Sequence, residues 1–401
     1  MKLTASDISE ENLNKEVEVY GIVFHVREIG KKKFIILTDG KSILQVVYEG
    51  DFKVKRGDSI KVKGIVLKDE RAPKGVEVRA KEVLMLNEIE KESFDEWSLK
   101  RMSLDKKIKY RSISMRIPEE FNTFLIYSKV LNLLREFALK KGLLEIVSPK
   151  VVYMGTESGS EVFSILYFDK EAYLAQSNQL YKQMILACGY KGVFEIGSYY
   201  RAEVSRTTRH LTEFRIFDVE LNYVEDMNEI LDFIREMIEF VFKNLNLEKP
   251  EFETITFKDA KEILLKNGIK IKDDLTTEAE EKLYEIFKKD FIFVTEFPFS
   301  ARPFYTMKKN EYSYSFDLLF KGLEIISGAK REHRYKILYE QIKEKNINPE
   351  RLYWYLEAFK HGIPPHGGFG FGIERFVKQL LNKENIREVT LYPRDPDTIL
   401  P

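Results

Sequence analysis

The sequence predicts an α+β protein with an N-terminal β-barrel and a larger domain whose mainly antiparallel sheet is flanked by helices. Its 401 residues are too many for one ordinary core, which favours two domains. Residues 16–86 alternate between apolar and polar residues, whereas helical spacing begins only near residue 119. In the second part, strand-like runs follow one another without strict alternation with helices, which argues against a doubly wound parallel sheet.

The N-terminal domain is expected over residues 1–88. It contains five β-rich runs: VEVYGIVFHV, KFIILTDG, SILQVVYEG, SIKVKGIVL and GVEVRAKEVLML. Asp39-Gly40 predicts a turn between the second and third runs, while Gly21 and Gly64 lie inside runs. This pattern favours a small closed barrel such as an OB-fold, with an SH3-like barrel as the alternative.

A linker is expected over residues 89–118, which are charged and lack sustained periodicity. The second domain, residues 119–401, opens with apolar residues at helical spacing up to Gly142. Further helices are expected at about 226–244, 335–346, 350–361 and 372–382. Strands are expected at about 143–153, 162–175, 193–201, 214–223, 291–296 and 312–327.

Composition constrains the partners only weakly. Lys+Arg and Asp+Glu each number 65, so any basic surface must be local. The single cysteine, Cys188, excludes a disulfide within the chain and is expected to be a small core residue. The N-terminus lacks a signal-peptide pattern, and no apolar run is long enough to span a membrane. We therefore expect a cytoplasmic protein with no membrane partner.

The segment FEIGSYYRAEVSRTTRHLTEF, residues 194–214, carries the first candidate site. Arg201 and Glu203 are two residues apart on an expected strand and should share a face. A guanidinium can clamp a phosphate, and a carboxylate can accept from the amino group of adenine. Phe214 can stack on a base, while Arg209 and His210 can reach terminal phosphates. A salt-bridged surface hairpin is the alternative.

The segment GGFGFGIERFVKQLL, residues 367–381, is the second candidate. Its glycines precede a helix that carries Arg375 in its first turn, and Gly372 stands next to that helix. Glycines allow a ligand close to the backbone, and a helix N-terminus favours anions. The segment has neither a dinucleotide-binding nor a P-loop pattern, and a packing turn is the alternative.

Two further segments carry polar residues beside apolar ones. In FDLLFKGLEIISGAKREH, Glu324 and Ser327 offer oxygen ligands that suit Mg²⁺ held jointly with phosphates, although an ordinary strand edge is the alternative. In YLAQSNQLYKQMILA, Ser177 is a candidate N-cap, and Gln179 and Lys182 share a helix face. A solvated lysine is the alternative there. The loop GTESGSEVF, with Glu157, could close over a ligand.

Taken together and in this order, these segments resemble a known family. PKVV near Pro149, FEIGSYYRAEVSRTTRHLTEF and GGFGFGIER resemble motifs 1, 2 and 3 of class II aminoacyl-tRNA synthetases. TESGSEVF, LAQSNQLYKQ, RPFYTM, FDLLFKGLEIISGAKREH, GIPPHGGFGFGIER and NIREVTLYPRDP resemble aspartyl-tRNA synthetases of the archaeal–eukaryotic branch. The resemblance covers nearly the whole chain. It implies an OB-fold that binds the anticodon, a class II catalytic domain and a homodimer formed through motif 1.

The resemblance implies a two-step reaction. L-Aspartate and Mg-ATP give aspartyl-adenylate and pyrophosphate, and the acyl group then passes to the terminal ribose of the tRNA. Adenylation needs no protein nucleophile, so positioning and neutralisation of phosphate charge would carry the rate.

The resemblance also implies the nucleotide contacts. Arg201 would touch the α-phosphate and the attacking carboxylate, and Arg375 would grip ATP from the opposite face; these are the implied catalytic residues. The implied ATP-binding set is Arg201, Glu203, Arg209, His210, Leu211, Phe214, Glu324, Gly372 and Arg375. Glu324 and Ser327 would bind Mg²⁺.

For the amino acid, the resemblance implies that Lys182 and Arg331 bind the side-chain carboxylate and that Asp218 and Gln179 surround the α-amino group. Two cations would reject asparagine, because an amide would leave them unpaired. The full implied aspartate-binding set is Glu157, Gln176, Gln179, Lys182, Arg201, Asp218, Ser327 and Arg331.

For tRNA, the resemblance implies anticodon contacts from Arg27, Phe34 and Gln45 on the barrel. Phe24 and Pro73 occupy positions that suggest an enzyme charging both aspartate and asparagine tRNAs.

The chain departs from the family pattern at two positions near the site. Lys330 and Asn178 replace a usual glutamine and a usual proline. The alternatives are an asparaginyl-tRNA synthetase, an aspartate-adenylating asparagine synthetase and a non-catalytic paralogue.

Overall fold

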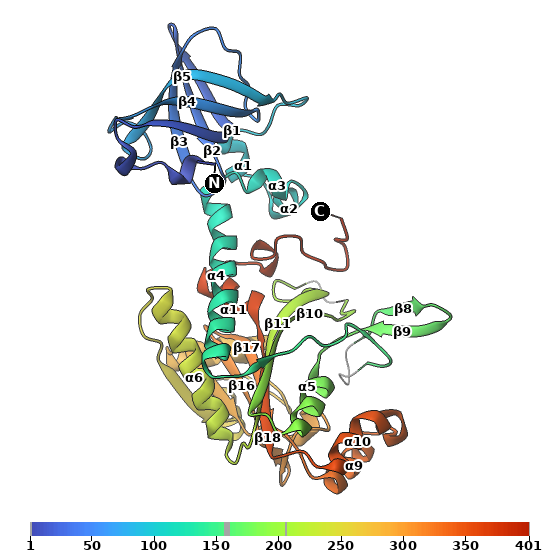
Figure 1. Ribbon diagram of the computed structural model, residues 1–401. Coiled ribbons are helices and arrows are strands. Elements are labelled where there is room, and N and C mark those ends of the chain that lie inside the picture. Colours follow the sequence, from blue (N-terminus) through green and yellow to red (C-terminus); the bar gives the residue numbers. More distant parts are fainter. Residues whose placement is uncertain (1, 156–160, 205–206, 401) are drawn as a thin grey trace. The chain divides into compact units, whose positions relative to one another are not determined.

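The computed structural model describes residues 2–155, 161–204 and 207–400. The chain forms two compact units, Met1–Ile126 with Leu400–Pro401, and Tyr127–Ile399 (Figure 1). The expected boundaries near residues 88 and 118 remain predictions. No helix among the described residues is long and apolar enough to cross a membrane.

The N-terminal unit is built on a closed barrel in the strand order β1-β2-β3-β5-β4. Its strands are β1 (Glu16–Ile29), β2 (Lys32–Thr38), β3 (Ile43–Glu49), β4 (Ser59–Lys68) and β5 (Val76–Asn87). All pairs are antiparallel except β3–β5. Gly64 lies where the β4–β5 register shifts, and a Cβ there would stand 2.3 Å from the Arg79 carbonyl oxygen. The predicted five-stranded barrel is therefore confirmed.

The segment expected to be an irregular linker contains three short helices. They are α1 (Glu96–Lys100), α2 (Leu104–Lys109) and α3 (Arg111–Ser114). Each is too short for a 3.6-residue period to be recognised in the sequence. Leu99 and Ile117 from this segment bury a cluster together with Phe24 of β1.

The second unit contains an eight-stranded sheet in the order β12-β13-β16-β17-β18-β11-β10-β6. All pairs are antiparallel except β12–β13 and β6–β10, so the predicted mainly antiparallel sheet is confirmed. The strands are β6 (Leu144–Glu145), β10 (Gly192–Tyr200), β11 (Glu213–Asn222), β12 (Phe252–Thr256), β13 (Phe291–Thr295), β16 (Ser315–Phe320), β17 (Leu323–Lys330) and β18 (His366–Gly372).

Two small sheets accompany it. One joins β7 (Val151–Val152), β9 (Lys170–Leu174) and β8 (Ser164–Tyr167), and the other pairs β14 (Lys308–Lys309) with β15 (Tyr312–Ser313).

Helices cover the large sheet. Helix α6 (Met227–Asn244) lies along one face beside the end of α4 (Pro118–Lys140), as Figure 1 shows. Phe233 of α6 contacts Phe137 of α4 at 5.2 Å and Phe369 of β18 at 6.1 Å between ring centroids. Helices α5 (Gln179–Ile185), α9 (Tyr335–Glu344) and α10 (Tyr353–His361) share another apolar cluster. Helix α11 (Ile373–Leu380) follows β18 directly.

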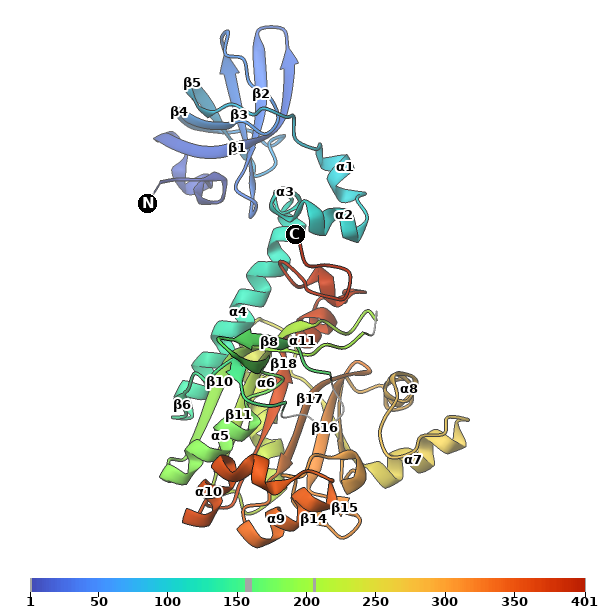
Figure 2. The ribbon, with the colours of Figure 1, turned by 90° about the vertical axis from the view of Figure 1, so that its right-hand side faces the viewer.

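Beyond the linker helices, the sequence prediction missed strand β18 and one longer segment, and it placed Cys188 wrongly. Strand β12 and helices α7 (Phe257–Lys266) and α8 (Thr277–Phe287) were not expected; Figure 2 shows α7 and α8 on the β16–β17 side of the unit. Cys188 is exposed, not buried, because it ends a 3-10 turn before Gly189, whose φ is +79°.

Candidate active site

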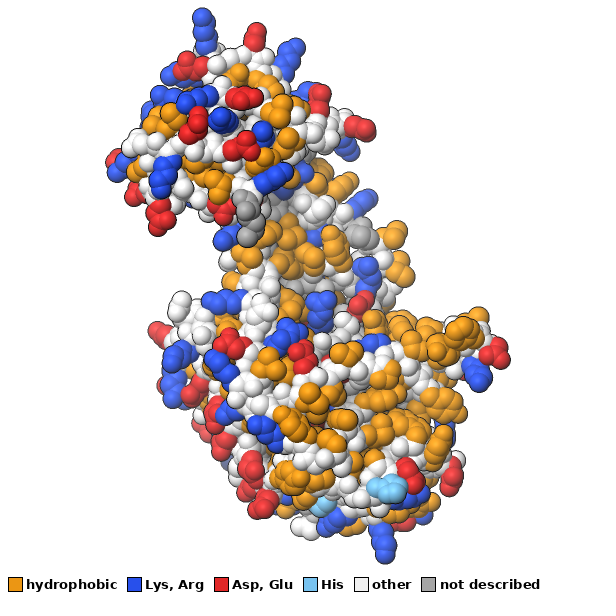
Figure 3. Space-filling model, viewed as in Figure 1, with side chains coloured by type: hydrophobic (Ala, Val, Ile, Leu, Met, Phe, Trp, Pro, Cys, Tyr) orange, Lys and Arg blue, Asp and Glu red, His pale blue; other side chains and the backbone are white. Residues whose placement is uncertain are grey.

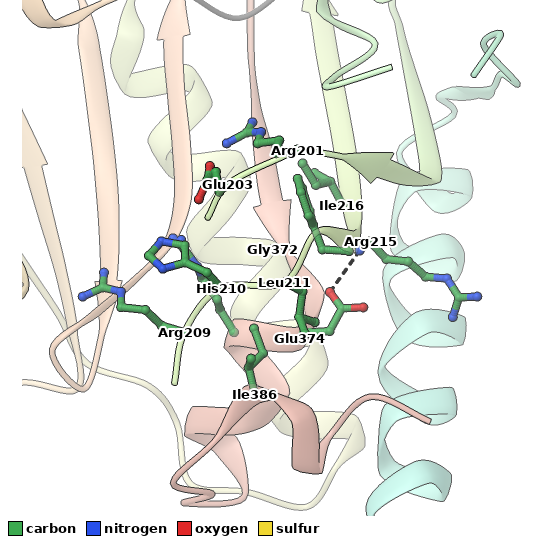
Figure 4. Close-up of a pocket in the computed structure, with 12 residues that line it drawn as sticks. Arg201, Glu203, Arg209, His210, Leu211, Arg215, Ile216, Gly372, Glu374 and Ile386 are labelled. Atoms are coloured by element: carbon green, nitrogen blue, oxygen red, sulfur yellow. Dashed lines mark hydrogen bonds between the residues drawn. The ribbon is translucent and has the colours of Figure 1, made fainter. Parts of the chain in front are cut away.

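Two cavities lie against the large sheet, and Arg201 and Ile216 line both. The first, of about 190 Å³, is lined by Arg201, Glu203, Arg209, His210, Leu211, Phe214, Arg215, Ile216, Gly372, Glu374, Arg375 and Ile386 (Figure 4). The second, of about 320 Å³, is lined by residues that include Gln179, Asp218, Arg302, Ser327 and Arg331. A ligand in one cavity would therefore share Arg201 with a ligand in the other.

Arg201 and Glu203 lie beyond the end of β10, not on the strand that was predicted. The backbone N–H of Arg201 still donates to the Thr212 carbonyl oxygen at 3.0 Å. The backbone N–H of Ala202 donates instead to the Glu161 carbonyl oxygen at 2.9 Å, outside the sheet. Strand alternation therefore does not place the two side chains. Both nevertheless line the first cavity (Figure 4). The Arg201 guanidinium carbon lies 5.2 Å from the centre of the Phe214 ring.

Cationic groups gather at the first cavity. Arg209, His210 and Arg375 line it together with Arg201. Burial lowers the pKa of His210, and the nearby Arg375 lowers it further. At neutral pH the imidazole is therefore uncharged, so the three arginines provide the positive charge for an anionic ligand.

Arg215 lines this cavity but points its side chain away from it (Figure 4). Its backbone N–H donates to the Glu374 carboxylate at 3.1 Å, and the Tyr127 hydroxyl donates to the same carboxylate at 2.8 Å. Glu374, missed in the sequence analysis, is thus a buried support for the strand that carries Phe214.

A β-bulge in β17 orients the two predicted metal ligands. Leu318 pairs with Ile326 and Leu319 with Glu324, which leaves Ile325 as the extra residue. In a regular strand, residues three apart face opposite sides, but one extra residue restores a common side. Glu324 and Ser327 can therefore face the same way despite their spacing.

Each residue of this pair contacts a guanidinium group, and a third oxygen-bearing side chain lies beside Ser327. Arg375 Nη1 lies 3.3 Å from Glu324 Oε1, and Arg302 Nη1 donates to Ser327 Oγ at 3.4 Å. Asp317, opposite Ser327, forms a 2.7 Å ion pair with Arg302 through Oδ2, while its Oδ1 is buried without a hydrogen-bond partner. Oxygen donors of this kind fit Mg²⁺ bound jointly with phosphates. No group of three metal-ligating side chains occurs among the described residues.

The second cavity combines opposite charges. Gln179, Asp218 and Arg331 line it, whereas Lys182 does not. Lys182 is buried and its Nζ donates to Asp218 Oδ1 at 3.0 Å. Burial raises the pKa of Asp218, although Lys182 opposes this shift.

Glu220 is the most important residue that the sequence analysis missed. It is fully buried and accepts from Arg331 Nε at 2.8 Å, while Lys182 Nζ lies 3.2 Å from its Oε2 and Gln179 Nε2 donates to it at 3.3 Å. Burial alone would raise the pKa of Glu220, but Arg331 and Lys182 outweigh burial and lower it to about 2. Its position two residues after Asp218 on β11 was the available signal, because strand residues two apart share a face.

The glycine-rich segment lies in β18, and its glycines have two different roles: close strand packing and cavity lining. A Cβ on Gly368 would stand 2.1 Å from the Val219 carbonyl oxygen, so Gly368 serves close strand packing. Gly370 lines the second cavity and Gly372 the first. The segment is a strand and not the packing turn of the alternative; within it, Gly368 has a packing role, and Gly370 and Gly372 line the cavities.

Several other predicted residues lie elsewhere. Gln176 is buried and donates to the Glu161 carbonyl oxygen at 3.5 Å, and Glu157 lies outside the described residues. The N-cap of α5 is Asn178, not Ser177, because the helix begins at Gln179.

The two departures from the family pattern have partners of their own. Asn178 Nδ2 donates to Glu195 at 2.7 Å, a bond that the proline usual at that position could not form. Lys330 donates to the backbone carbonyl oxygen of Glu225.

The predicted tRNA contacts all lie in the N-terminal unit. Arg27 of β1 pairs with Phe34 of β2, and Phe34 is half-buried. Gln45 donates to Glu77 at 2.9 Å. Phe24 is only 4% exposed, so direct contact with RNA is not available to it, whereas Pro73 is exposed.

Comparison with known proteins identifies the family. Residues 103–396 match the model for class II tRNA synthetases (D, K and N), and residues 17–86 match the OB-fold nucleic acid binding domain. The OB-fold prediction for the barrel is thereby confirmed over the SH3-like alternative.

Two full-length relatives are similar in sequence. A Methanopyrus kandleri protein named aspartate–tRNA(Asp/Asn) ligase is 40% identical over 99% of this chain and 98% of its own length. A Pyrococcus furiosus protein named aspartate–tRNA(Asp) ligase is 38% identical over 99% of each chain.

Solved structures agree with this assignment. The crystal structure of asparaginyl-tRNA synthetase from Pyrococcus horikoshii with asparaginyl-adenylate matches with a TM-score of 0.92 and 30% identity, covering all of both chains. A putative aspartyl-tRNA synthetase from Leishmania major Friedlin matches with a TM-score of 0.91 and 28% identity, covering all of this chain and 95% of its own. This chain therefore belongs to the class II tRNA synthetases of the D, K and N group.

Proposed function

We propose that this protein activates L-aspartate with ATP and transfers it to tRNA. The observation that carries the proposal is Arg201, which lines both cavities. A nucleotide α-phosphate in the first cavity and an amino-acid carboxylate in the second would meet at one guanidinium. Such positioning turns a reaction of two ligands into an effectively intramolecular one.

ATP fits the first cavity by its chemistry. Phe214 offers a ring face for adenine, and Glu203 offers an acceptor for its amino group. Arg209 and Arg375 offer positive charge for the phosphates, as expected for stabilisation of phosphate charge without a protein nucleophile. Mg²⁺ bound with ATP would supply further neutralisation, and Glu324 and Ser327 are the residues that would hold it.

Aspartate, not asparagine, fits the second cavity. Arg331 lines this cavity, and Lys182 lies behind Asp218, so the pocket presents a cation to a side-chain carboxylate. Glu220 already balances Arg331, so a carboxylate ligand would add a second charge-assisted acceptor for this guanidinium, whereas an amide would add only a neutral one. Asparaginyl-tRNA synthetase is the second candidate, because the structural neighbours include that enzyme.

We further propose that the enzyme charges both aspartate and asparagine tRNAs. The relative at 40% identity is named for both tRNAs, although the relative at 38% is named for aspartate tRNA alone. Pro73 is exposed on the turn between β4 and β5, where it could touch RNA, while Phe24 could act only indirectly.

A homodimer would explain the exposed apolar surface around the β8–β9 hairpin of the second unit, which Figure 3 shows as a group of hydrophobic side chains. Leu166 and Phe168 in this hairpin are 83% and 84% exposed, and Val147, close to Pro149, is 91% exposed. Large exposed apolar patches mark protein interfaces. A monomer by sedimentation would contradict this part of the proposal.

ATP–pyrophosphate exchange with each amino acid tests the proposal. We expect stimulation by aspartate and none by asparagine. Exchange with asparagine alone would establish the second candidate, and no exchange with any amino acid would refute both. Aspartylation assays with purified asparagine tRNA would then test the proposal that both tRNAs are charged. That proposal is wrong if only aspartate tRNA is charged.

A further inference from the structure

Helix α8, which the sequence analysis missed, reaches the back of the first cavity through Glu280. This carboxylate is buried, with 4% of the residue exposed, and it is not among the residues that line the cavity. Its Oε2 accepts from Arg209 Nη2 at 2.6 Å. Arg209 Nη1 donates to Thr277 Oγ1, in the first turn of the same helix, at 2.7 Å. Two groups of α8 therefore hold both terminal nitrogens of an arginine whose side chain lines the cavity.

The same oxygen of Glu280 makes a second contact. It accepts from the backbone N–H of Glu324 at 3.1 Å. Glu324 is next to the extra residue of the β17 bulge, and its side chain meets Arg375. One carboxylate thus joins a cation of the first cavity to the strand that presents the candidate metal ligand.

Opposing influences act on the charge of Glu280. Burial raises the pKa of Glu280, repulsion by Glu324 adds to this, and Arg209 opposes it, with a result of about 7. Independently of this shift, the two hydrogen bonds from α8 fix the direction of the Arg209 guanidinium by geometry.

We propose that Glu280, assisted by Thr277, is a positioning residue that holds Arg209 ready for the terminal phosphates of ATP. The inference rests on the proposed function of the first cavity. An arginine side chain has many rotamers, and fixing one of them costs conformational entropy. If this cost arose only when ATP bound, it would weaken ATP binding. Docking on α8 has already ordered it. Glu280 itself does not touch the substrate and acts through Arg209.

Glu280→Gln tests this inference, because glutamine keeps the shape and can still accept from the Glu324 N–H but loses the charge. Removing the charge from a charge-assisted hydrogen bond should raise the KM for ATP about tenfold. The KM for aspartate should stay within about twofold, because the second cavity is untouched. Glu281→Gln, an exposed neighbour on the same helix, is the matched control and should change neither KM.

A double-mutant cycle identifies the route of the effect. In an Arg209→Met background, Glu280→Gln should add less than about a twofold change in the KM for ATP. Thr277→Val, at an exposed position where folding is not at risk, should raise the KM for ATP about threefold by removing the second anchor. Thermal unfolding of each variant verifies folding.

The outcomes separate this inference from the proposed function. Wild-type protein that shows no aspartate-dependent exchange contradicts the proposed function. Active wild-type protein overturns the inference if Glu280→Gln leaves the KM for ATP unchanged, raises both KM values equally, or acts undiminished without Arg209. An unchanged KM for ATP in Thr277→Val also overturns it if Glu280→Gln does not fold.

Discussion

Glu220→Gln is the substitution that most directly tests the electrostatic description of the second cavity. Glutamine matches glutamate in shape but carries no charge. Glu220 is fully buried between Arg331 and Lys182, so its loss of charge would leave two buried cations with only Asp218 to balance them.

The magnitude follows from the pKa of Glu220. A change from 4.5 to about 2 corresponds to about 3 kcal/mol in favour of the ionised, folded form at neutral pH. Removing one partner of a buried ion pair costs about 3–5 kcal/mol, which agrees. Because the folded pKa is lowered, the stabilisation is complete above pH 4.5 and disappears as the pH falls toward 2.

Thermal unfolding is the assay. A loss of about 3 kcal/mol should lower the midpoint of the second unit by about 6 °C at pH 7, using about 2 °C per kcal/mol for a unit of this size. The difference between variant and wild type should shrink below pH 4.5. Glu357→Gln, which removes an exposed partner of Lys360, is the control and should leave the midpoint unchanged. A midpoint within 1 °C of wild type in Glu220→Gln would refute the reasoning.

Three further predictions concern residues of the same unit. Gly368→Ala should destabilise the unit by about 3 kcal/mol or more in urea unfolding, because its Cβ would meet the Val219 carbonyl oxygen at 2.1 Å; a change below about 1 kcal/mol would contradict the strand packing described. Lys182→Met should raise the KM for aspartate about a hundredfold in exchange assays and leave that for ATP unchanged, whereas an equal rise in both would show a general disturbance. Tyr127→Phe should cost about 2 kcal/mol of unfolding free energy, because it removes the hydroxyl that donates to the buried Glu374 carboxylate. An unshifted urea midpoint would show that this hydrogen bond is not needed.

The architecture was predicted well wherever a regular spacing of apolar residues continues over many residues. The barrel strands alternate and α6 carries a strong apolar face, so both were found. Helix α8 was missed because its eleven residues expose several charges and bury only Ala279, Glu280 and Leu283. A helix with so few buried positions has a weak periodic signal, although Thr276 is a normal N-cap.

The predicted nucleotide-binding set agrees closely with the lining of the first cavity, and the predicted aspartate-binding set agrees less completely with the lining of the second. All predicted nucleotide residues line the first cavity except Glu324, which contacts Arg375. Glu220 was not recognised, because its place on β11 does not reveal its partners, which come from α5 and from Arg331, directly after β17. Long-range charge compensation of this kind is a property of the folded sheet and has no local pattern.

The β17 bulge has a consequence for how this site can vary. Because the extra residue at Ile325 places Glu324 and Ser327 on one side, their separation of three residues depends on the bulge and not on the ligands. Deleting Ile325 would give a regular strand in which the same two side chains stand two residues apart and still face together. A related chain could therefore keep the site with a spacing of two, whereas a spacing of three without a bulge would separate the ligands across the sheet.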